Sequence, residues 1–459
     1  MEYLQQRNTL VQVACSEWDY DPELATNTLV SRWNLVCSRR PLVALADAVY
    51  SAGALAAMGI ASYFVESVGR KPIIITGVIV LLLSTLGITF ADTYIMYVTT
   101  RFLNSGGTTA VFVISQALLF EVSTDRRRAR TMVIAFAFGD IAAELWFDFS
   151  YRLRLRWQHL QAIMLSPTLL MMSAFLVVYE SPRWLLYKRH IQEAEAVLLA
   201  AARKNGFSPS EAPIMTEKLQ EEVANSNLVR VKDPDQPSFN DIRRCTVVMT
   251  VTYFSATFAF YGMLQSLVAR HQAQVRLSAS AASAVWFILL VFVIDRLPRL
   301  PLTTVLFAML GSLSALMSVA TEATDVHAVL FIVAKGCSQV TLLMNIILIL
   351  ELFPTPLRCQ ALCLTFACGR VAAVLASLLQ VVRYAGRDDF VLGLMALLAF
   401  VSMLVLRCIP GPGKSPSSSD MGHTLDNQKP SSATSLNLEA MKETLEPVVY
   451  GKEAQEEAQ

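Results

Sequence analysis

The chain is poor in charged side chains, because Asp, Glu, Lys and Arg make up only 16% of its 459 residues. Soluble globular domains carry about 25% of such residues, so a soluble globular protein is not expected. Positive charge is not in excess either, since 38 basic residues face 37 acidic ones. This balance argues against a polybasic binder of nucleic acid or anionic lipid. The composition, 54% apolar with a mean hydropathy of +0.46, instead predicts a polytopic membrane protein.

Signals of catalysis and of metal binding are also missing. The five histidines are scattered and lack the spacing of a metal site. No nucleophile is paired with a base in any motif of the sequence. The glycine pair Gly106–Gly107 lies inside an apolar segment, so it indicates close helix contact and not a phosphate-binding loop. We therefore expect no enzyme activity, no metal, no cofactor and no nucleic-acid partner.

Eleven apolar segments run along the chain, and most reach the roughly 17–25 residues that span a bilayer. Because lipid cannot satisfy an open sheet edge, we predict that all of them are helices. Residues 1–40 are polar and do not resemble a cleaved signal peptide. The predicted spans are 42–65, 72–91, 94–119, 131–149, 159–179, 245–268, 279–294, 302–320, 326–350, 360–382 and 389–409.

Lys and Arg concentrate in the connectors after the first, third, seventh and ninth segments and in the long connector. The positive-inside rule therefore places those connectors in the cytoplasm. In the predicted layout an extracellular segment (1–41) precedes an N-terminal bundle of five spans (42–179). A cytoplasmic connector (180–244), with amphipathic helices at 182–205 and 214–224, leads to a C-terminal bundle of six spans (245–409). The polar tail (410–459) is expected to be disordered and cytoplasmic.

Two cysteines lie in the predicted extracellular segment, Cys15 and Cys37, and the other six lie in the spans or at their ends. In an oxidising compartment these two could form a disulfide, and they could equally remain free thiols. No Asn-x-Ser/Thr sequence occurs anywhere in the chain, so N-glycosylation is not expected.

Two motifs recur at nearly one offset. Residues 66–72 and 295–301 both read acid-x-x-(Gly/Pro)-Arg-x-Pro and lie 229 residues apart. An acid seven residues before an arginine closes the third segment and again the ninth, 230 residues apart. We therefore predict two homologous halves related as parallel repeats, in a plan of twelve helices whose first member is absent here.

These motifs suit a cytoplasmic gate, because a carboxylate at one helix end can pair with guanidinium groups and helix termini of a neighbour. We expect the pairs to lie near the surface, where each contributes about 0–1 kcal/mol to stability. The predicted gating residues are Glu66, Gly69, Arg70, Lys71, Glu121, Arg128, Asp295, Arg299, Glu351 and Arg358.

Ionisable residues inside the predicted spans normally face the bundle interior. Asp140, Glu144 and Asp148 follow an i, i+4, i+8 spacing, so they line one helical face. These acids could bind an organic cation or carry protons. Alternatively, they could be the counter-charges of the other charged span residues, which are Arg101, Lys335 and Arg370, with Asp47 as a further acid.

Aromatic residues of the sixth and seventh spans could stack on a substrate cation, for about 0.5–2 kcal/mol each. Tyr253 and Tyr261 are eight residues apart and share a helical face, so they are the first candidates. Ordinary helix packing is the alternative explanation for these rings.

Four stretches resemble solute carrier family 22, the organic cation, organic anion and carnitine transporters of the major facilitator superfamily. Residues 15–37 look like the end of the family's first extracellular loop, and residues 179–186 (Tyr-Glu-Ser-Pro-Arg-Trp-Leu-Leu) look like the start of its cytoplasmic domain. Residues 351–358 (Glu-Leu-Phe-Pro-Thr-Pro-Leu-Arg) are similar to another family run, and residues 66–72 to the superfamily loop motif. The family's first helix has no counterpart here.

The resemblance implies an all-α major facilitator-like bundle of two six-helix repeats, with about 11 of 12 helices present. It implies a secondary transporter of small organic ions, working by alternating access in the plasma membrane. Arg370 and Lys335 resemble arginine and lysine of anion-transporting members, and Asp140, Glu144, Tyr253 and Tyr261 complete the predicted substrate site. The alternative is a truncated, non-transporting relative that assembles with a full-length transporter, so a homo- or hetero-oligomer is left open.

Overall fold

The computed structural model describes residues 2–6, 9–13, 18, 28–124, 127–153, 155, 157–206, 239–270, 273–319, 324–384 and 388–409. The predictions for the helix at 214–224, for the tail at 410–459 and for Cys15 lie outside these residues. All helices described below belong to one compact unit, Met1–Ser123 with Arg127–Pro410. Of the second unit, Thr124–Arg126 with Gly411–Gln459, only Thr124 is described.

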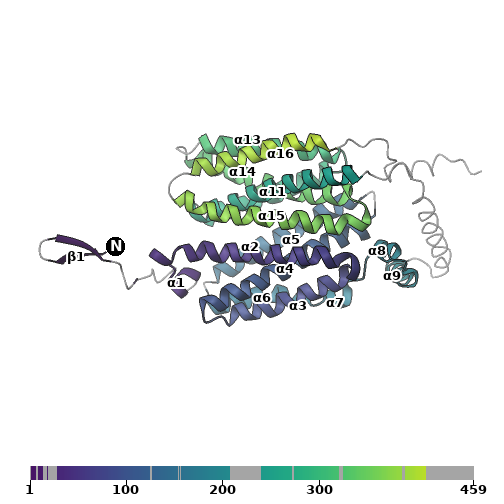
Figure 1. Cartoon of the computed structure of the whole chain (residues 1–459), viewed down its shortest axis with the longest axis horizontal. Helices are drawn as coiled ribbons and strands as arrows, with labels where there is room; N and C mark the ends of the chain where they lie inside the picture. Colours follow the sequence, from purple (N-terminus) through teal and green to yellow (C-terminus); the bar gives the residue numbers. More distant parts are fainter. Residues whose placement is uncertain are drawn as a thin grey trace, which may run out of the picture. The chain divides into compact units, whose positions relative to one another are not determined.

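Helices make up most of the described chain (Figure 1). The first half contains α1 (Leu29–Trp33), η2 (Cys37–Arg39), α2 (Pro41–Val68), α3 (Arg70–Thr89), α4 (Tyr94–Val122), α5 (Arg128–Arg152), α6 (Trp157–Met171) and α7 (Ala174–Val177). The connector contributes α8 (Pro182–Tyr187) and α9 (Ile191–Lys204). The second half contains α11 (Phe239–Arg270), α12 (Ala273–Val293), α13 (Arg299–Val319), α14 (Thr324–Leu352), α15 (Thr355–Tyr384), α16 (Asp388–Val405) and η5 (Leu406–Cys408).

Each of the eleven predicted spans corresponds to helix in the structure, so the prediction of a helical polytopic bundle is confirmed. The fifth span is divided between α6 and α7, with a turn at Met172 and Ser173. Within the described residues, 8 helices are long and apolar enough to cross a membrane. Helix α5 does not qualify because it carries three acids, and α6 has only 15 residues.

The extreme N-terminus holds an element that the sequence analysis did not predict. Strands β1 (Glu2–Gln6) and β2 (Thr9–Val13) pair antiparallel, with Glu2 opposite Val13 and Gln6 opposite Thr9. The second strand is rich in Val, Leu and Thr, which favour extended backbone. A separation of two residues also suits a hairpin. The hairpin and helix α1 occupy part of the predicted extracellular segment at 1–41.

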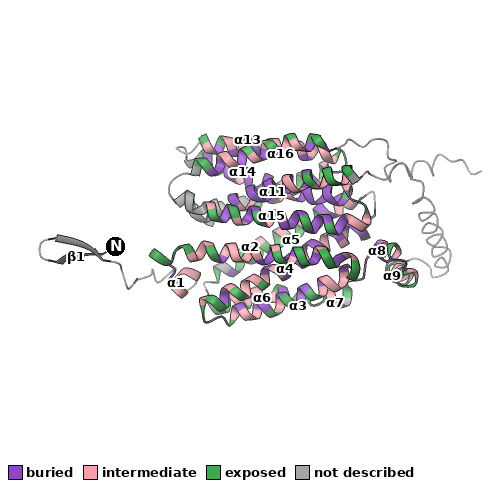
Figure 2. Cartoon of the chain, in the orientation of Figure 1, coloured by how far each residue is buried: buried purple, intermediate pink, exposed green. Residues whose placement is uncertain are grey.

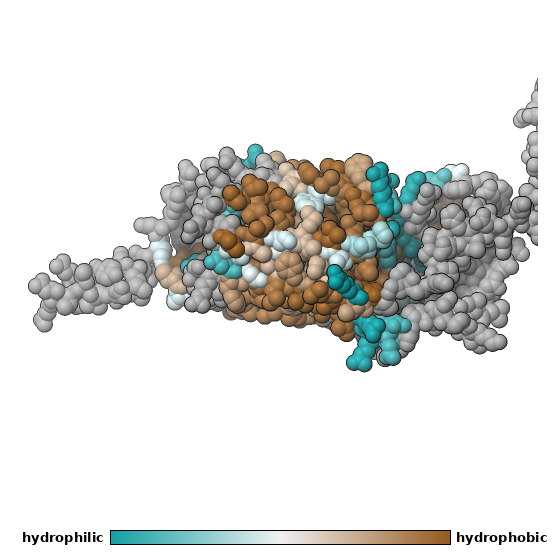
Figure 3. All heavy atoms as spheres, turned by 90° about the horizontal axis from the view of Figure 1, so that it is seen from above, coloured by the Kyte–Doolittle hydropathy of each residue, from teal (hydrophilic) through white to brown (hydrophobic). Residues whose placement is uncertain are grey.

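The outer faces of the helices are apolar. Large hydrophobic side chains are exposed along their length, among them Tyr63 (79%), Leu170 (76%) and Val319 (84%). Exposed residues recur over whole helices (Figure 2), and hydrophobic surface covers the middle of the visible face with hydrophilic residues gathered at one end (Figure 3). Soluble monomers rarely expose contiguous patches beyond a few hundred Å². These faces therefore meet the hydrocarbon of a bilayer.

Helix packing repeats between the two halves (Figure 1). Helix α4 packs against α2 and α3, and α14 packs in the same way against α12 and α13. Helix α3 packs against α6 as α13 packs against α16. The predicted duplication is therefore confirmed as an architecture of two matched bundles. Helix α11 packs against α14, α15 and α16, but no described helix of the first half takes the equivalent place against α4, α5 and α6.

Small residues let the helices of the first half approach closely. A Cβ placed on Gly53 of α2 would lie 2.1 Å from the carbonyl oxygen of Phe102 in α4. A Cβ on Gly107 of α4 would lie 2.8 Å from the backbone nitrogen of Leu81 in α3. The prediction of close helix contact at the glycine pair is therefore confirmed, and backbone contact fixes the spacing of α2, α3 and α4.

We predict that Gly53→Ala lowers stability, because the added methyl group must push α2 away from α4. Overpacking of this kind costs about 1–3 kcal/mol. Gly59 lies in the same helix with nothing within 4 Å of an added Cβ, so Gly59→Ala is the matched control. It should be neutral or stabilising by up to about 1 kcal/mol, because alanine is the better helix former. Thermal unfolding of the two purified variants in detergent tests this, and equal effects would contradict it.

Candidate functional site

Arg70 is the centre of a charge cluster at the start of α3. Its side chain is 0% exposed, and its Nη2 donates to Glu121 Oε1 of α4 at 3.2 Å and to Glu66 Oε1 of α2 at 3.4 Å. The Glu121 side chain is also 0% exposed. One buried guanidinium therefore joins three helices and compensates the charge of two carboxylates.

Glu180, just before α8, caps the same helix end. The backbone N–H groups of Arg70 and Lys71 donate to its two carboxylate oxygens, each at 3.0 Å. A carboxylate here satisfies N–H groups that the first turn of a helix leaves unpaired and complements the positive end of the helix dipole. Gly69 permits the approach, since its φ is +98° and a Cβ there would lie 2.5 Å from Glu180 Oε2.

Helix α8 is fixed to the charge cluster around Arg70, which we call the corner of the first half, by its own N-terminal cap and by a tryptophan. Ser181 Oγ accepts a hydrogen bond from the Trp184 backbone N–H at 3.3 Å. The helix predicted at 182–205 does begin at Pro182, but a turn at 188–190 divides it into α8 and α9. The Trp184 indole N–H donates to the Glu66 carbonyl at 3.4 Å, and the Arg70 guanidinium lies 5.6 Å from the indole ring centre. Two sequence motifs that lie over a hundred residues apart thus form one structural unit.

The second half repeats the central pair. Arg299 Nε lies 3.1 Å from Glu351 Oε1, and both side chains are 30% exposed. These residues follow Arg70 and Glu121 by the offsets of the internal repeat, so the same pair is formed twice. The corners differ because Pro298 stands where Gly69 stands in the first half. Proline cannot adopt the positive φ of Gly69.

Residues of the two halves meet between these corners, at the end of the bundle that we call the motif end. The guanidinium groups of Arg128 and Arg358 lie 4.9 and 5.0 Å from the ring centre of Phe120. Arg130 Nε lies 3.1 Å from Asp295 Oδ2. Arg358 also donates through Nε to the Leu350 carbonyl at 2.7 Å. All ten predicted gating residues therefore lie at the motif end.

The expectation that these pairs lie near the surface is correct for Arg299 and Glu351 and wrong for Arg70 and Glu121. Sequence position places both pairs at helix ends, but α8 and its tryptophan cover the first pair. Burial changes the energetics, because removal of one partner from a buried pair costs about 3–5 kcal/mol. The sequence analysis also missed the contribution of Phe120, which carries no charge.

The acidic stripe of α5 faces α14 with two of its three members. Lys335 Nζ lies 2.9 Å from Glu144 Oε1, and Gln339 Nε2 donates to Asp140 Oδ1 at 3.0 Å. Asp148 instead pairs with Arg152 of its own helix at 2.8 Å. Arg101, Lys335 and Arg370 all lie in the described part of the chain, and there only Lys335 forms an ion pair with this stripe. Gln339 was missed because it is neutral, although its i+4 spacing from Lys335 matches the spacing of the acids.

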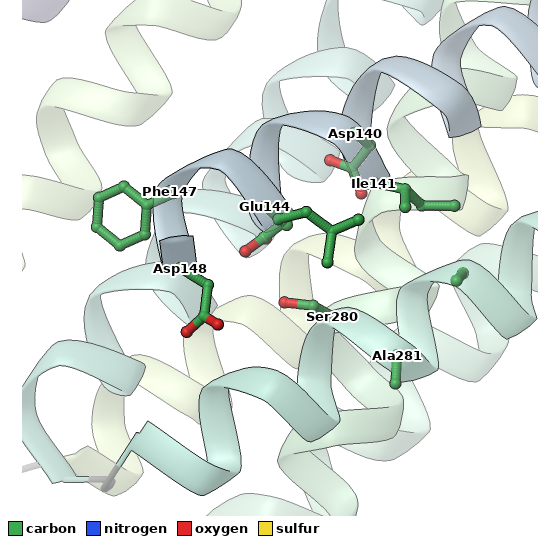
Figure 4. A pocket seen from close by; sticks show the side chains of 9 residues that line it. Asp140, Ile141, Glu144, Phe147, Asp148, Ser280 and Ala281 are labelled. Carbon is green, nitrogen blue, oxygen red and sulfur yellow. The ribbon is translucent and has the colours of Figure 1, made fainter. Parts of the chain in front are cut away.

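The same acids line a pocket of about 160 Å³ between α5 and α12 (Figure 4). Its walls are Asp140, Ile141, Glu144, Leu145, Phe147, Asp148, Ser280, Ala281 and Ala284. Figure 4 shows the Ser280 hydroxyl pointing from α12 toward the acids of α5. Among the described residues, no three His, Cys, Asp or Glu side chains are grouped as a metal site.

Arg370 lies in α15, away from the acids. Its Nη1 donates to the Tyr261 hydroxyl of α11, and its guanidinium lies 5.8 Å from the centre of that ring. Tyr253 is buried, and its ring centre lies 4.7 Å from that of Phe366. A Cβ added to Gly369, the residue before Arg370, would lie 2.5 Å from Tyr253 Cε1. The two predicted tyrosines therefore lie beside Arg370, one bonded to it and one packed behind it.

The remaining charged span residues pair at the other end of the bundle. Arg101 Nη2 lies 3.1 Å from Asp47 Oδ1, and Arg101 also donates to the Tyr97 hydroxyl. The ring centre of Tyr50 lies 5.1 Å from the Arg101 guanidinium. Arg101 thus neutralises Asp47 within the first half and does not reach the stripe of α5.

Cys37, one half of the predicted disulfide, is exposed.

We predict that Arg70→Ala lowers the free energy of unfolding by about 3–5 kcal/mol, because the buried Glu121 carboxylate then loses the guanidinium bonded to it. Its repeat partner is the control: Arg299→Ala removes a partly exposed pair and should cost about 0–1 kcal/mol. Thermal unfolding of the purified variants measures both. Equal shifts in Tm for the two variants would contradict the assignment of a buried and an exposed corner.

Known proteins of similar sequence are transporters. The human solute carrier family 22 member 11 is 27% identical over 384 residues, which cover 80% of this chain and 68% of that protein. The rat solute carrier family 22 member 7 is 26% identical over 380 residues (80% and 69%). The organic cation transporter protein of Drosophila melanogaster is 28% identical over 258 residues, which span 54% of this chain and about half (46%) of that protein.

Solved structures share the fold. The inward-open xylose transporter XylE from E. coli superimposes with a TM-score of 0.62 at 17% identity, covering 85% of this chain and 91% of that one. The human organic anion transporter MFSD10 gives 0.56 at 12% identity, covering 79% and 83%. The sugar (and other) transporter family model matches residues 21–410. The chain is therefore a multi-pass membrane protein of the sugar (and other) transporter family, within the major facilitator superfamily, and it is similar to solute carrier family 22 members.

Proposed function

We propose that the protein carries small organic ions across the membrane by alternating access between its two halves, and that Arg370 binds an anionic group of the substrate. The observation that carries this proposal is the partner of Arg370. In the described part of the chain its guanidinium is bonded to a tyrosine hydroxyl and has no ion pair with a carboxylate. A guanidinium offers a fork of donors that matches a carboxylate.

Charge accounting supports an anionic or zwitterionic substrate. Among the described span residues, Asp47 pairs with Arg101, Glu144 with Lys335, and Asp148 with Arg152. Asp140 is bonded to the neutral Gln339, and Arg370 to the neutral Tyr261. Asp140 and Arg370, from opposite halves, thus have no ion pair of their own, and Asp140 shares the charge of Lys335 with Glu144. A carboxylate would bind at Arg370, and a zwitterion could also use Asp140.

Relatives support the same range of substrates. The match to the beta-alanine transporter of Drosophila melanogaster is 26% identical over 267 residues, covering 56% of this chain and 44% of that protein. Beta-alanine carries a carboxylate and an ammonium group, as carnitine carries a carboxylate and a quaternary ammonium. We propose the organic anions and zwitterions as the substrate class. Tyr261 orients Arg370, and Tyr253 packs behind it against Gly369.

The motif end supplies the proposed gate. Contacts between the halves there, Arg130 with Asp295 and the Phe120 ring with the Arg358 guanidinium, hold this end together in the present conformation. They must separate if the substrate is to leave on that side. We propose that this is the cytoplasmic side in the plasma membrane, with the N-terminal 1–41 outside and the tail 410–459 inside.

We predict that Arg370→Ala reduces uptake of organic carboxylates about 10–100-fold, because a charge-assisted hydrogen bond is worth about 1.5–3 kcal/mol and 1.4 kcal/mol is a factor of ten. Uptake of labelled organic anions, cations and zwitterions into cells measures this. Arg407→Ala, at an exposed position in η5, is the control and should leave uptake unchanged. Unchanged uptake in Arg370→Ala, or no uptake of any class by protein at the cell surface, would overturn the proposal.

A second candidate function, assembly with another membrane protein, is favoured by the face of α4, α5 and α6. This face is equivalent to the one that α11 covers in the second half, and no described helix covers it. Helix α5 exposes Phe138 (75%), and a Cβ added to the adjacent Gly139 would meet nothing within 4 Å, whereas its repeat equivalent Gly369 is packed by Tyr253 of α11. A transmembrane helix of a partner chain would bury this surface.

We predict that this assembly depends on the α5 side chains. Co-purification with a full-length family member should fall in Phe138→Ala, because the partner helix loses apolar contacts. Val305→Ala in α13, at an exposed position of the other half, should not change it. Equal recovery of the partner with all variants would count against assembly through this face.

A further inference from the structure

Two rungs of a ladder join α5 of the first half to α14 of the second. Lys335 and Gln339 are four residues apart on α14, and Asp140 and Glu144 are four residues apart on α5. The rungs are Lys335 Nζ to Glu144 Oε1 at 2.9 Å and Gln339 Nε2 to Asp140 Oδ1 at 3.0 Å. Gln339 Nε2 also lies 3.2 Å from Asp140 Oδ2. Residues four apart lie on one helical face, so the rungs are in register.

The two partners of the charged rung differ in their access to water. The Lys335 side chain is 3% exposed, whereas the Glu144 side chain is 28% exposed and lines the pocket beside α12. When the rung opens, the carboxylate can turn into the pocket, but the ammonium remains enclosed. A buried charge without a partner is far more costly than an exposed one. Opening is therefore easier when Glu144 is the group that moves.

The surroundings of Lys335 hold it in place. The next residue, Gly336, is packed by the Trp286 indole, since a Cβ there would lie 2.3 Å from Trp286 Cδ1. The Ser338 hydroxyl donates to the Lys335 carbonyl at 2.7 Å. Helix α14 is also the most deeply buried of the eight described spans, whereas α5 exposes apolar side chains along its length. The fixed side of the ladder is α14, and the movable side is α5.

We propose that this α5–α14 ladder is a latch between the two halves within the membrane, that its Glu144–Lys335 rung opens as the halves tilt, and that Glu144 is the partner that leaves. The inference rests on the proposed function to the extent that alternating access makes the halves move against each other. The substrate-free opening of the latch is a property of the protein that can be measured without transport.

The latch is tested by labelling a cysteine placed at Ala284 in the pocket wall with N-ethylmaleimide in membranes. The reagent is neutral, so changes of charge in the pocket do not attract or repel it. The same chain without Ala284→Cys gives the background from the native cysteines. Glu144→Gln should speed labelling about tenfold, because the enclosed Lys335 then loses the carboxylate bonded to it and keeps only the charge of nearby Asp140, so the rung no longer holds the pocket wall.

Three further variants in the Ala284→Cys protein sharpen the result. Lys335→Met should change labelling less than Glu144→Gln, because the remaining carboxylate reaches pocket water. The charge swap Glu144→Lys with Lys335→Glu should return labelling close to the parent rate. Asp148→Asn, which changes a pocket acid outside the ladder, should leave it unchanged.

Several outcomes would overturn the latch. The first is that Glu144→Gln labels at the rate of the parent protein. The second is that the charge-swapped protein labels as fast as Glu144→Gln. The third is that Asp148→Asn changes the labelling rate as much as Glu144→Gln does. If Glu144→Gln does not fold, Glu144→Gln combined with Lys335→Met removes both charges, and it should label faster than the parent. A parent rate in that double variant would equally reject the latch. The labelling experiment needs no substrate. Its results can therefore be interpreted even if the protein transports nothing, so failure of the latch and failure of the proposed function are distinguishable.

Discussion

An arginine guanidinium bonded to a carboxylate of the neighbouring helix fixes the motif end of each half. Arg70 with Glu121 and Arg299 with Glu351 are the same pair in two copies, at 3.2 and 3.1 Å. Both arginines stand in the first turn of a helix, α3 or α13, where a nearby carboxylate also complements the helix dipole. The chain thereby forms the same pair at two corners, one buried and one partly exposed, and the contacts between the halves lie between them.

The same principle, charge compensation between helices, organises the interior. Helices in lipid cannot leave ionised side chains without partners, so each paired charge fixes one helix against another. Asp47 with Arg101 joins α2 to α4, and Glu144 with Lys335 joins α5 to α14. The Arg370 guanidinium, which is bonded to a tyrosine hydroxyl and not to a carboxylate, is the group that we propose binds the substrate. The arrangement of the helices and the proposed substrate site thus both follow from which charged side chains are paired.

The sequence predicts the spans and the duplication well, because lipid demands long apolar runs and repeated motifs keep their spacing. It predicts the charge pairs only in part. Which acid meets which base depends on the depth and rotation of two helices, and neither can be read from one helix alone. Hence the stripe on α5 was assigned Arg101 and Arg370 as well as Lys335, and the neutral Gln339 was overlooked. The burial of Arg70 likewise depends on α8, a distant segment.

The central claim, one acid–arginine pair formed twice, is tested most directly by double-mutant cycles in the purified protein. The free energy of unfolding is measured for single and double alanine variants of Arg70 with Glu121, of Arg299 with Glu351, and of the mixed pair Arg70 with Glu351. The account predicts a coupling energy of about 0.5–3 kcal/mol within each pair, larger in the buried one, and additivity for the mixed pair. Additive effects within both pairs would contradict it.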